Sequence, residues 1–382
     1  NRYDFLNLNT CRFLWKQVKF PTATDASNTT AQVLKQGETQ GSDVAAHSAG
    51  VLNIKTTILP DADALFLTAI DRYGHELWRW TFPVNKLNQA NEVLSPLSNK
   101  VTSTETENEL TVKAKNHTFI FSKKDGQLKG VSVNNRKISF ANGPRFIGAR
   151  RADRSLDQFY NHDDEKAKEK DRTYSEFPDA AVFTKLDVKE DGGNLIVTAN
   201  YKLGNLDKVQ WTINPNGEAV LDYTYNFSGV VDLMGICFDY PEDQVISKRW
   251  LGAGPYRVWQ NRIHGTQYDV WENDYNDPIP GETFTYPEFK GYFGSVSWMN
   301  IRTKEGTISL TNETPDAYIG VYQPRDGRDR LLYTLPESGI SVLNVIPPVR
   351  NKVNSTDLCG PSSQPKWVNG PQSGRIIFRF ME

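Results

Sequence analysis

The chain of 382 residues has few cysteines and methionines, three of each. Cys11, Cys237 and Cys359 are odd in number and widely spaced, which excludes a disulfide framework and a zinc cluster as the organising element of the fold. Long apolar runs are missing too. One of the longest, residues 64–67, falls far short of the ~18 residues that a membrane-spanning helix needs, so the sequence predicts no membrane segment.

An excess of either charge is also absent. Lys plus Arg number 44 against 46 for Asp plus Glu, which gives a net charge of −2. A chain this balanced has no electrostatic attraction for nucleic acid or for an anionic membrane surface. The first residues include no initiator Met and no signal-peptide pattern, so we expect a piece of a longer protein. The compartment stays open, with a periplasmic or secreted location favoured for a bacterial source.

Aromatic residues are plentiful, at 12% with nine Trp, a composition typical of β-sheet. The length suggests two domains, or three. Within residues 1–85, apolar and polar positions alternate in short runs. Such runs lie at residues 11–15, 51–54, 65–70 and 77–82. Period-2 alternation at this spacing predicts an immunoglobulin-like β-sandwich of about seven strands.

Residues 86–108 are mostly Asn, Ser, Thr, Glu and Lys, without periodicity, and we expect a linker there. Strand patterning resumes over residues 109–382, where Asp125-Gly126 marks a hairpin. Further strands are expected at 195–199, 209–213, 219–227, 296–301, 307–310, 318–321 and 375–380. No helical period is sustained, so the sequence predicts an all-β fold whose second part is a large two-sheet sandwich.

Residues 153–172 interrupt this pattern with a run of mixed charges. A solvated loop or one short charged helix explains it best. His162 lies beside several carboxylates, but contiguous side chains cannot all converge on one ion, so a metal site is disfavoured, and a mobile lid is the remaining alternative.

The densest chemistry lies in residues 250–298, where twelve aromatics occur in 49 residues, about twice the chain average. Polar residues such as Arg257, Asn261 and Arg262 lie among them. Carbohydrate sites need this mixture, because flat rings cover the C–H faces of a sugar while polar groups bond its hydroxyls. The alternative is that most of these rings form sandwich core.

The sequence offers no catalytic pair of its own. Glycoside hydrolysis usually needs two carboxylates ~5–10 Å apart. Asn-Glu pairs at 91–92, 108–109 and 312–313 lack a βα context, and no nucleophile-elbow motif is present. We therefore expect the chain alone to be inactive and predict no cofactor, while a structural or site cation in a full enzyme stays open.

The run Trp-Leu-Gly-Ala-Gly-Pro-Tyr-Arg at 250–257, followed by Asn261 and Arg262, resembles the Gly-x-Gly-Pro…Arg segment of family-2 glycoside hydrolases of the β-galactosidase type. Residues 286–291 are similar to the Pro-x-Glu-x-Gly stretch that follows it in those enzymes. The segments 143–153 and 1–15 resemble the start of the same C-terminal domain and the immunoglobulin-like domain before it. The resemblance covers nearly the whole chain.

This resemblance implies the last two domains of such a hydrolase: an immunoglobulin-like linker domain and a galactose-mutarotase-like β-super-sandwich. The acid/base and nucleophile Glu of the family lie on a (β/α)₈ barrel, which is missing here and would belong to the same parent chain. The implied substrate is a galactoside-type carbohydrate. Trp367 matches the aromatic residue that this domain can lend to the sugar site. The other candidate substrate-binding residues are Tyr256, Arg257, Asn261, Arg262 and Glu288.

Two other functions stay open. A free-standing carbohydrate-binding module would bind glycans without any barrel. A mutarotase-like epimerase would use Glu288 and His264 to equilibrate sugar anomers. The sequence leaves open which glycoside is cleaved and whether the chain assembles as a homo-oligomer.

Overall fold

The computed structural model describes residues 1, 6–25, 30–85, 100–151, 174–177, 179–274, 291–321, 339–348 and 361–382. Their helices are short 3₁₀ turns, η1 (Leu8–Thr10), η2 (Glu242–Gln244) and η4 (Pro361–Ser363). None of the helices in these stretches has the length and apolar character to cross a membrane. Nearly all remaining regular structure is strand, which confirms the predicted all-β class.

The chain folds as two compact units. The first comprises Asn1–Asn91 and Gln267–Trp271, and the second comprises Glu92–Thr266 and Glu272–Glu382. Part of the segment predicted to be a linker is a strand, because β5 (Thr102–Glu105) pairs with β6 (Glu109–Ala114). Its four side chains are all exposed, so an edge strand of this composition has no apolar alternation to reveal it.

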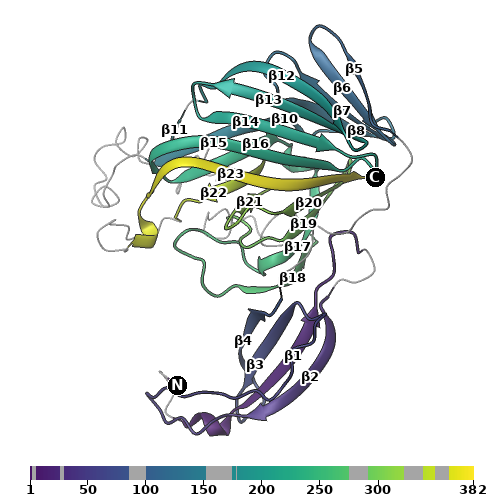
Figure 1. Cartoon of the computed structure of the whole chain (residues 1–382). Coiled ribbons are helices and arrows are strands. Elements are labelled where there is room, and N and C mark those ends of the chain that lie inside the picture. Colours follow the sequence, from purple (N-terminus) through teal and green to yellow (C-terminus); the bar gives the residue numbers. More distant parts are fainter. Residues whose placement is uncertain are drawn as a thin grey trace, which may run out of the picture. The chain divides into compact units, whose positions relative to one another are not determined.

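The first unit contains one antiparallel sheet in the order β2-β1-β3-β4 (Figure 1). Its strands are β1 (Arg12–Lys19), β2 (Gln32–Gln40), β3 (Ala64–Ile70) and β4 (Glu76–Pro83). Phe13 and Trp15 of β1 are buried because alternate residues of a strand face the same side. The indole of Trp15 lies over Gly37 of β2, where an added Cβ would approach it to 2.3 Å.

The prediction of about seven strands in residues 1–85 is wrong for the described residues of that range, which form four. Residues 51–54, expected as a strand, belong to no helix or strand. Gln17, fully buried on β1, donates from its amide nitrogen to the carbonyl oxygen of Thr57, a few residues further along the chain, at 2.8 Å. The amide oxygen of Gln17 accepts from the main-chain N–H of Leu59 at 2.7 Å. One side chain thus satisfies polar backbone groups that a neighbouring strand would otherwise pair.

The second unit contains two large antiparallel sheets. The first has the order β21-β22-β16-β10-β8-β7-β6-β5, with β11 paired to β10 and β9 to β8. Besides β5 and β6 its strands are β7 (His117–Ser122), β8 (Leu128–Val133), β9 (Arg136–Ile138), β10 (Ala141–Arg151), β11 (Tyr174–Glu176), β16 (Leu233–Asp239), β21 (Tyr318–Gly320) and β22 (Ile340–Val345). The predicted hairpin at Asp125-Gly126 is confirmed between β7 and β8, where Gly126 has φ 73°.

The second sheet runs in the order β12-β13-β14-β15-β23-β20-β19-β17. Its strands are β12 (Val182–Asp191), β13 (Asn194–Lys202), β14 (Leu206–Ile213), β15 (Ala219–Val231), β17 (Val245–Gly254), β19 (Trp298–Thr303), β20 (Gly306–Asn312) and β23 (Lys366–Met381). A further strand, β18 (Gln267–Asn273), follows β17 in the chain. Figure 1 shows β23 running along the sheet between β15 and β20. Each strand predicted for this sheet is present, and the charged run 153–172 lies outside the described residues.

The core of this unit lies between its two sheets and is largely aromatic. Trp211 of β14 packs against Phe121 of β7 with ring centroids 6.2 Å apart. Phe140 contacts Phe378 of β23 at 5.2 Å and stacks on Phe238 of β16 at 4.5 Å. Such rings bury large apolar areas, and this burial holds the two sheets together as the sandwich that the sequence predicted.

Candidate functional site

The glycine-rich run at the end of β17 brings two stretches of backbone into close contact. A Cβ on Gly252 would lie 3.0 Å from the carbonyl oxygen of Gly294. The next residue, Ala253, donates its N–H to that same oxygen at 2.9 Å, and the indole N–H of Trp250 donates to the carbonyl of Ala253 at 2.9 Å. The glycine therefore has a packing role: it lets the end of β17 lie against the chain that leads into β19.

Two predicted site residues follow this turn. Tyr256 is 70% exposed. The guanidinium of Arg257 lies over the buried ring of Phe293, 5.1 Å from its centroid, which is within the range of a cation–π contact. Val258 then exchanges two main-chain hydrogen bonds with Tyr292, at 2.8 and 2.9 Å. Tyr256 is thus presented to solvent from a segment that is anchored on both sides.

The structure brings Asn261 close to the segment that leads to Trp367. The side-chain amide of Asn261 donates to Ser363 Oγ at 3.4 Å, and that of Gln260 donates to the carbonyl of Gln364 at 2.7 Å. Trp367 follows three residues later at the start of β23 and is 71% exposed. Gln260 is buried and was not among the residues singled out from the sequence, where a single Gln between aromatic residues gives no signal.

The remaining predicted residues are two exposed side chains and one residue outside the described part of the chain. Arg262 is exposed and its main chain pairs with that of Trp259. His264 is also exposed. Glu288 lies outside the described residues. Side-chain hydrogen bonds thus join the chain segments that carry Asn261 and lead into Trp367.

Most of the described aromatic rings in the 250–298 segment are core. Those that are almost completely buried are Trp250, Trp259, Tyr292, Phe293 and Trp298. Trp259 packs edge-on against Tyr292 with ring centroids 5.6 Å apart. The interpretation of this segment as a wall of sugar-stacking rings is therefore wrong for these five rings, because their faces are covered by protein. Tyr256 is the exception in exposing most of its surface.

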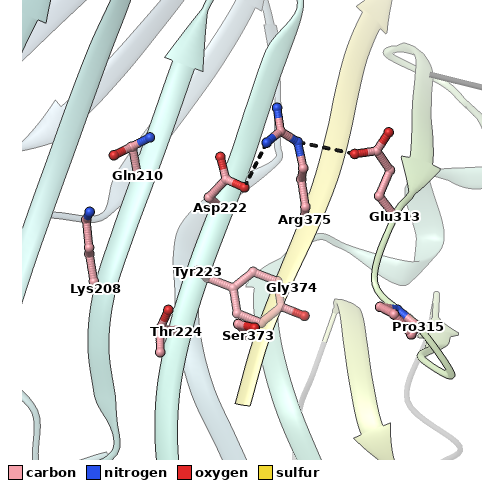
Figure 2. Close-up of a pocket in the computed structure, with 10 residues that line it drawn as sticks. All are labelled: Lys208, Gln210, Asp222, Tyr223, Thr224, Glu313, Pro315, Ser373, Gly374 and Arg375. Carbon is pink, nitrogen blue, oxygen red and sulfur yellow. Dashed lines mark hydrogen bonds and ion pairs between the residues drawn. The ribbon is translucent and has the colours of Figure 1, made fainter. Parts of the chain in front are cut away.

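A hollow of about 360 Å³ lies on the second sheet of the large unit. Its lining residues, drawn in Figure 2, are Lys208, Gln210, Asp222, Tyr223, Thr224, Glu313, Pro315, Ser373, Gly374 and Arg375. Sequence reasoning missed this site. It named Glu313 only within an Asn-Glu pair. Apart from Pro315, the other lining residues come from strands whose pairing is set by the fold.

Six of these side chains form two rows across three neighbouring strands. Gln210 of β14 is opposite Asp222 of β15, and Asp222 is opposite Arg375 of β23. Two residues away along each strand, Lys208, Thr224 and Ser373 form the second row by the same pairing. Residues two apart on a strand face the same side and neighbouring strands lie ~4.8 Å apart. The rows therefore make a compact grid of polar groups on one face.

The guanidinium of Arg375 lies between two carboxylates, as Figure 2 shows. Its Nη1 lies 3.4 Å from Asp222 Oδ1 and its Nε lies 3.2 Å from Glu313 Oε2. Glu313 is held in place by its own main chain, whose N–H donates to the carbonyl of Arg375 at 2.9 Å. Thr314 Oγ1 in turn accepts the N–H of Arg375 at 3.0 Å. The ion pairs thus sit on a hydrogen-bonded backbone frame.

Beneath this grid, Gly374 leaves room for the ring of Tyr223. A Cβ on Gly374 would lie 2.2 Å from the phenol oxygen and 2.6 Å from Thr314 Oγ1. Burial raises the pKa of Tyr223 to about 12, and the nearby Thr314 hydroxyl offsets part of this effect. The phenol therefore stays protonated at neutral pH. Among the described residues, no group of three His, Cys, Asp or Glu side chains is arranged to hold a metal ion.

Fold and site together describe an all-β protein, with a two-sheet sandwich as its larger unit and polar and aromatic groups at its surface. Residues 113–346 match the family described as the beta galactosidase small chain. The match spans more than half of the chain, and the chain belongs to this family. The predicted relationship to the C-terminal portion of a β-galactosidase is thereby confirmed.

Solved structures similar to the chain include a galactose 1-epimerase from Lactobacillus acidophilus, at 10% identity and a TM-score of 0.42, over 74% of this chain and 98% of that one. A GalM/aldose epimerase homologue from C. elegans is similar at 9% identity and a TM-score of 0.34, over 74% of this chain and 99% of that one. At these values the similarity carries no conclusion about function. A search of curated proteins finds no match.

Proposed function

We propose that this chain is the non-catalytic C-terminal portion of a β-galactosidase-like glycoside hydrolase, where it completes a galactoside cleft beside a (β/α)₈ catalytic barrel. The observation that carries the proposal is the match of residues 113–346 to the beta galactosidase small chain family. A small chain needs a partner region that supplies the catalytic groups, and its carbohydrate substrate follows from the activity that gives the family its name.

The chemistry of the described residues supports a non-catalytic role. A glycosidase flanks the scissile bond with two carboxylates, and substrate must fit between them. In the described part of the chain, Asp222 and Glu313 lie on either side of one position, but the guanidinium of Arg375 fills that position. A glycosidic bond therefore has no room between them. The strands and 3₁₀ turns of the described residues show no βα alternation of the kind that builds a barrel.

The surface suited to a galactoside cleft is the edge formed by the segment after β17 and the segment before β23. Asn261 and Ser363 join the two segments. Tyr256 exposes its ring from the first segment, and Trp367 exposes its ring from the start of β23, just after the second. An exposed ring on an anchored segment can stack on the apolar face of a sugar at low entropic cost. We propose Trp367 and Tyr256 as the stacking residues, and Asn261, Arg257 and Arg262 as the residues that bond hydroxyls.

The test is hydrolysis of nitrophenyl β-galactoside by the purified chain. We expect turnover no faster than in buffer. Turnover that disappears when a residue of this chain is substituted would contradict the proposal. A free-standing carbohydrate-binding module and an epimerase remain separate predictions. Calorimetry with galactosides tests the first, and the rate of anomer equilibration, with His264→Ala as the variant, tests the second.

A further inference from the structure

The hollow on the second sheet carries polar groups that the fold does not use. The side chains of Lys208, Gln210, Thr224 and Ser373 make no hydrogen bond or ion pair within the described chain. The ion pairs of Arg375 engage one oxygen of Asp222 and one of Glu313. In the same described part, the second oxygen of each carboxylate has no partner. These groups point to a ligand rather than to stability, since exposed ion pairs contribute little to folding.

The charge of the hollow is balanced. Lys208 and Arg375 supply two positive charges, and Asp222 and Glu313 supply two negative charges, so the four formal charges sum to zero. A site for a phosphate or a carboxylate would carry a positive excess. A balanced set of charged and neutral groups instead suits an uncharged ligand that both donates and accepts many hydrogen bonds.

The donor and acceptor groups match a ring of hydroxyls. Each hydroxyl donates one hydrogen bond and accepts others. The free carboxylate oxygens accept from hydroxyls, while the unused N–H groups of Arg375 and the ammonium of Lys208 donate to them. Hydrogen bonds to charged groups are about twice as strong as neutral ones. Pro315, exposed at the rim, adds an apolar surface for the C–H face of a sugar.

The site is also held in place before any ligand arrives. The amide nitrogen of Asn312 donates to the carbonyl of Val296 at 3.1 Å, and its amide oxygen accepts the N–H of Thr314 at 3.0 Å. Thr314 is buried and bonds the main chain of Arg375. Glu313 lies between these two anchored residues. Preorganisation of this kind lowers the entropic cost of binding.

We propose that this hollow is a binding site for one neutral pyranose ring, as a free sugar or as the terminal residue of a glycoside. Its volume of about 360 Å³ lies near the lower end of the ~300–1,000 Å³ usual for small-molecule sites, which suits a single ring. The choice of galactosides as first probe rests on the proposed function. The neutral sugar class rests on the balanced charges and the hydroxyl-matching groups.

The experiment is saturation-transfer NMR and calorimetry on the full chain with methyl β-galactoside. An open site of this size is expected to bind with a Kd on the order of 1 mM. Loss of a charged hydrogen-bonding group is expected to weaken binding about tenfold in Glu313→Ala and in Asp222→Ala. The matched control is Asp187→Ala, an exposed carboxylate on β12 of the same sheet, which should leave the Kd unchanged.

Galactose 6-phosphate serves as the charged comparison and should bind no more tightly than the neutral glycoside. The proposal is overturned if methyl β-galactoside and methyl β-glucoside both fail to bind at tens of millimolar concentration. Equal affinity in Glu313→Ala, Asp222→Ala and the parent chain, or tighter binding of the phosphorylated sugar, would also overturn it. These binding results do not depend on the outcome of the hydrolysis assay. Failure of this site and failure of the proposed function are therefore distinguishable.

Discussion

Gln260 donates its side-chain amide N–H to the main-chain carbonyl oxygen of Gln364, at an N···O distance of 2.7 Å. Both residues belong to the same sandwich but are 104 positions apart in sequence. The bond ties the segment after β17, which carries Asn261, to the segment that leads into Trp367 at the start of β23. It therefore fixes the relative position of the residues that we propose for the sugar cleft.

Replacing Gln260 by Leu should destabilise the chain by about 1 kcal/mol, because a buried hydrogen bond is lost from a carbonyl that has little access to water. The cost stays small because the amide oxygen of Gln260 has no hydrogen-bond partner in the described chain, so removing it carries a compensating gain. Urea unfolding monitored by tryptophan fluorescence measures the difference. Gln36→Leu, at an exposed position on β2, is the matched control and should stay within about 0.5 kcal/mol of the parent.

Substitution of Trp259 and of Trp367 should distinguish a tryptophan that packs in the core from one that contacts the sugar. Trp259 is 2% exposed, so Trp259→Ala should cost about 3–5 kcal/mol by opening a cavity in the core. Trp367 is mostly exposed, so Trp367→Ala should change the free energy of unfolding by less than about 0.5 kcal/mol. In an assembled hydrolase the second variant should nevertheless raise the KM for a galactoside. Equal destabilisation by the two variants would show that Trp367 is a packing residue.

Arg379 and Glu218 form an ion pair, and the effects of substituting them on the free energy of unfolding should be strongly non-additive. Arg379 Nε lies 2.7 Å from Glu218 Oε2, with both side chains nearly buried, and Nη1 also donates to Thr311 Oγ1 at 3.2 Å. Arg379→Met alone should cost about 3 kcal/mol, because it leaves a carboxylate with little solvent and no countercharge. The double variant Arg379→Met/Glu218→Leu should cost less than the sum of the single variants.

A double-mutant cycle in urea gives the coupling energy, which we expect to exceed about 1.5 kcal/mol. Arg12→Met with Glu38→Leu is the control cycle, since that pair is exposed on the first unit and should couple by less than about 0.5 kcal/mol. Additive losses at Arg379 and Glu218 would contradict the prediction.

His117 should make the stability of the large unit depend on pH. Burial lowers the pKa of His117 below its usual value, and the hydrogen bond from the ring to the Phe380 carbonyl offsets only part of this. The unfolded chain then binds a proton on this residue at a higher pH than the folded chain does. Stability should therefore fall as the pH drops from about 6.5 toward the lowered pKa of the folded state, and level off below it.

The measurement is the free energy of unfolding from pH 7.5 to 5, in His117→Gln and in the parent chain. The variant should be less stable at pH 7.5, since the packed imidazole is lost, but should show a shallower slope below pH 6.5. His264→Gln, at an exposed position, should keep the parent slope. An unchanged slope in His117→Gln would assign the pH dependence to other groups.

Sequence patterns predicted the elements whose side chains alternate between core and solvent. The strand at 209–213 was found in this way because Trp211 and its alternate neighbours are buried in β14. β23 was predicted only from residue 375, although it begins at Lys366. Its first half contains Gly370 and Pro371 and has no buried alternation, so its pairing with β15 could not be recognised locally.

The site residues also divide into those that could be identified from the sequence and those that could not. The resemblance to family-2 glycoside hydrolases singled out Tyr256 and Trp367, and the structure leaves both rings mostly exposed. Sequence patterns could not reveal the ion pairs of Arg375 with Asp222 and Glu313, because these three residues come from parts of the chain that are distant in sequence. Gln17 and Gln260 act through bonds to main-chain groups far along the chain. Such partners depend on topology, which local patterns do not encode.

The most direct measurement of the central claim is reconstitution. The purified chain is mixed with a separate polypeptide that carries the catalytic barrel of a β-galactosidase of the same family, and hydrolysis of nitrophenyl β-galactoside is followed against each polypeptide alone. We predict turnover in the mixture that exceeds the sum of the two separate rates and that falls with Trp367→Ala. A mixture no faster than the sum of the two separate rates, or hydrolysis of the substrate by this chain unaided, would contradict the account.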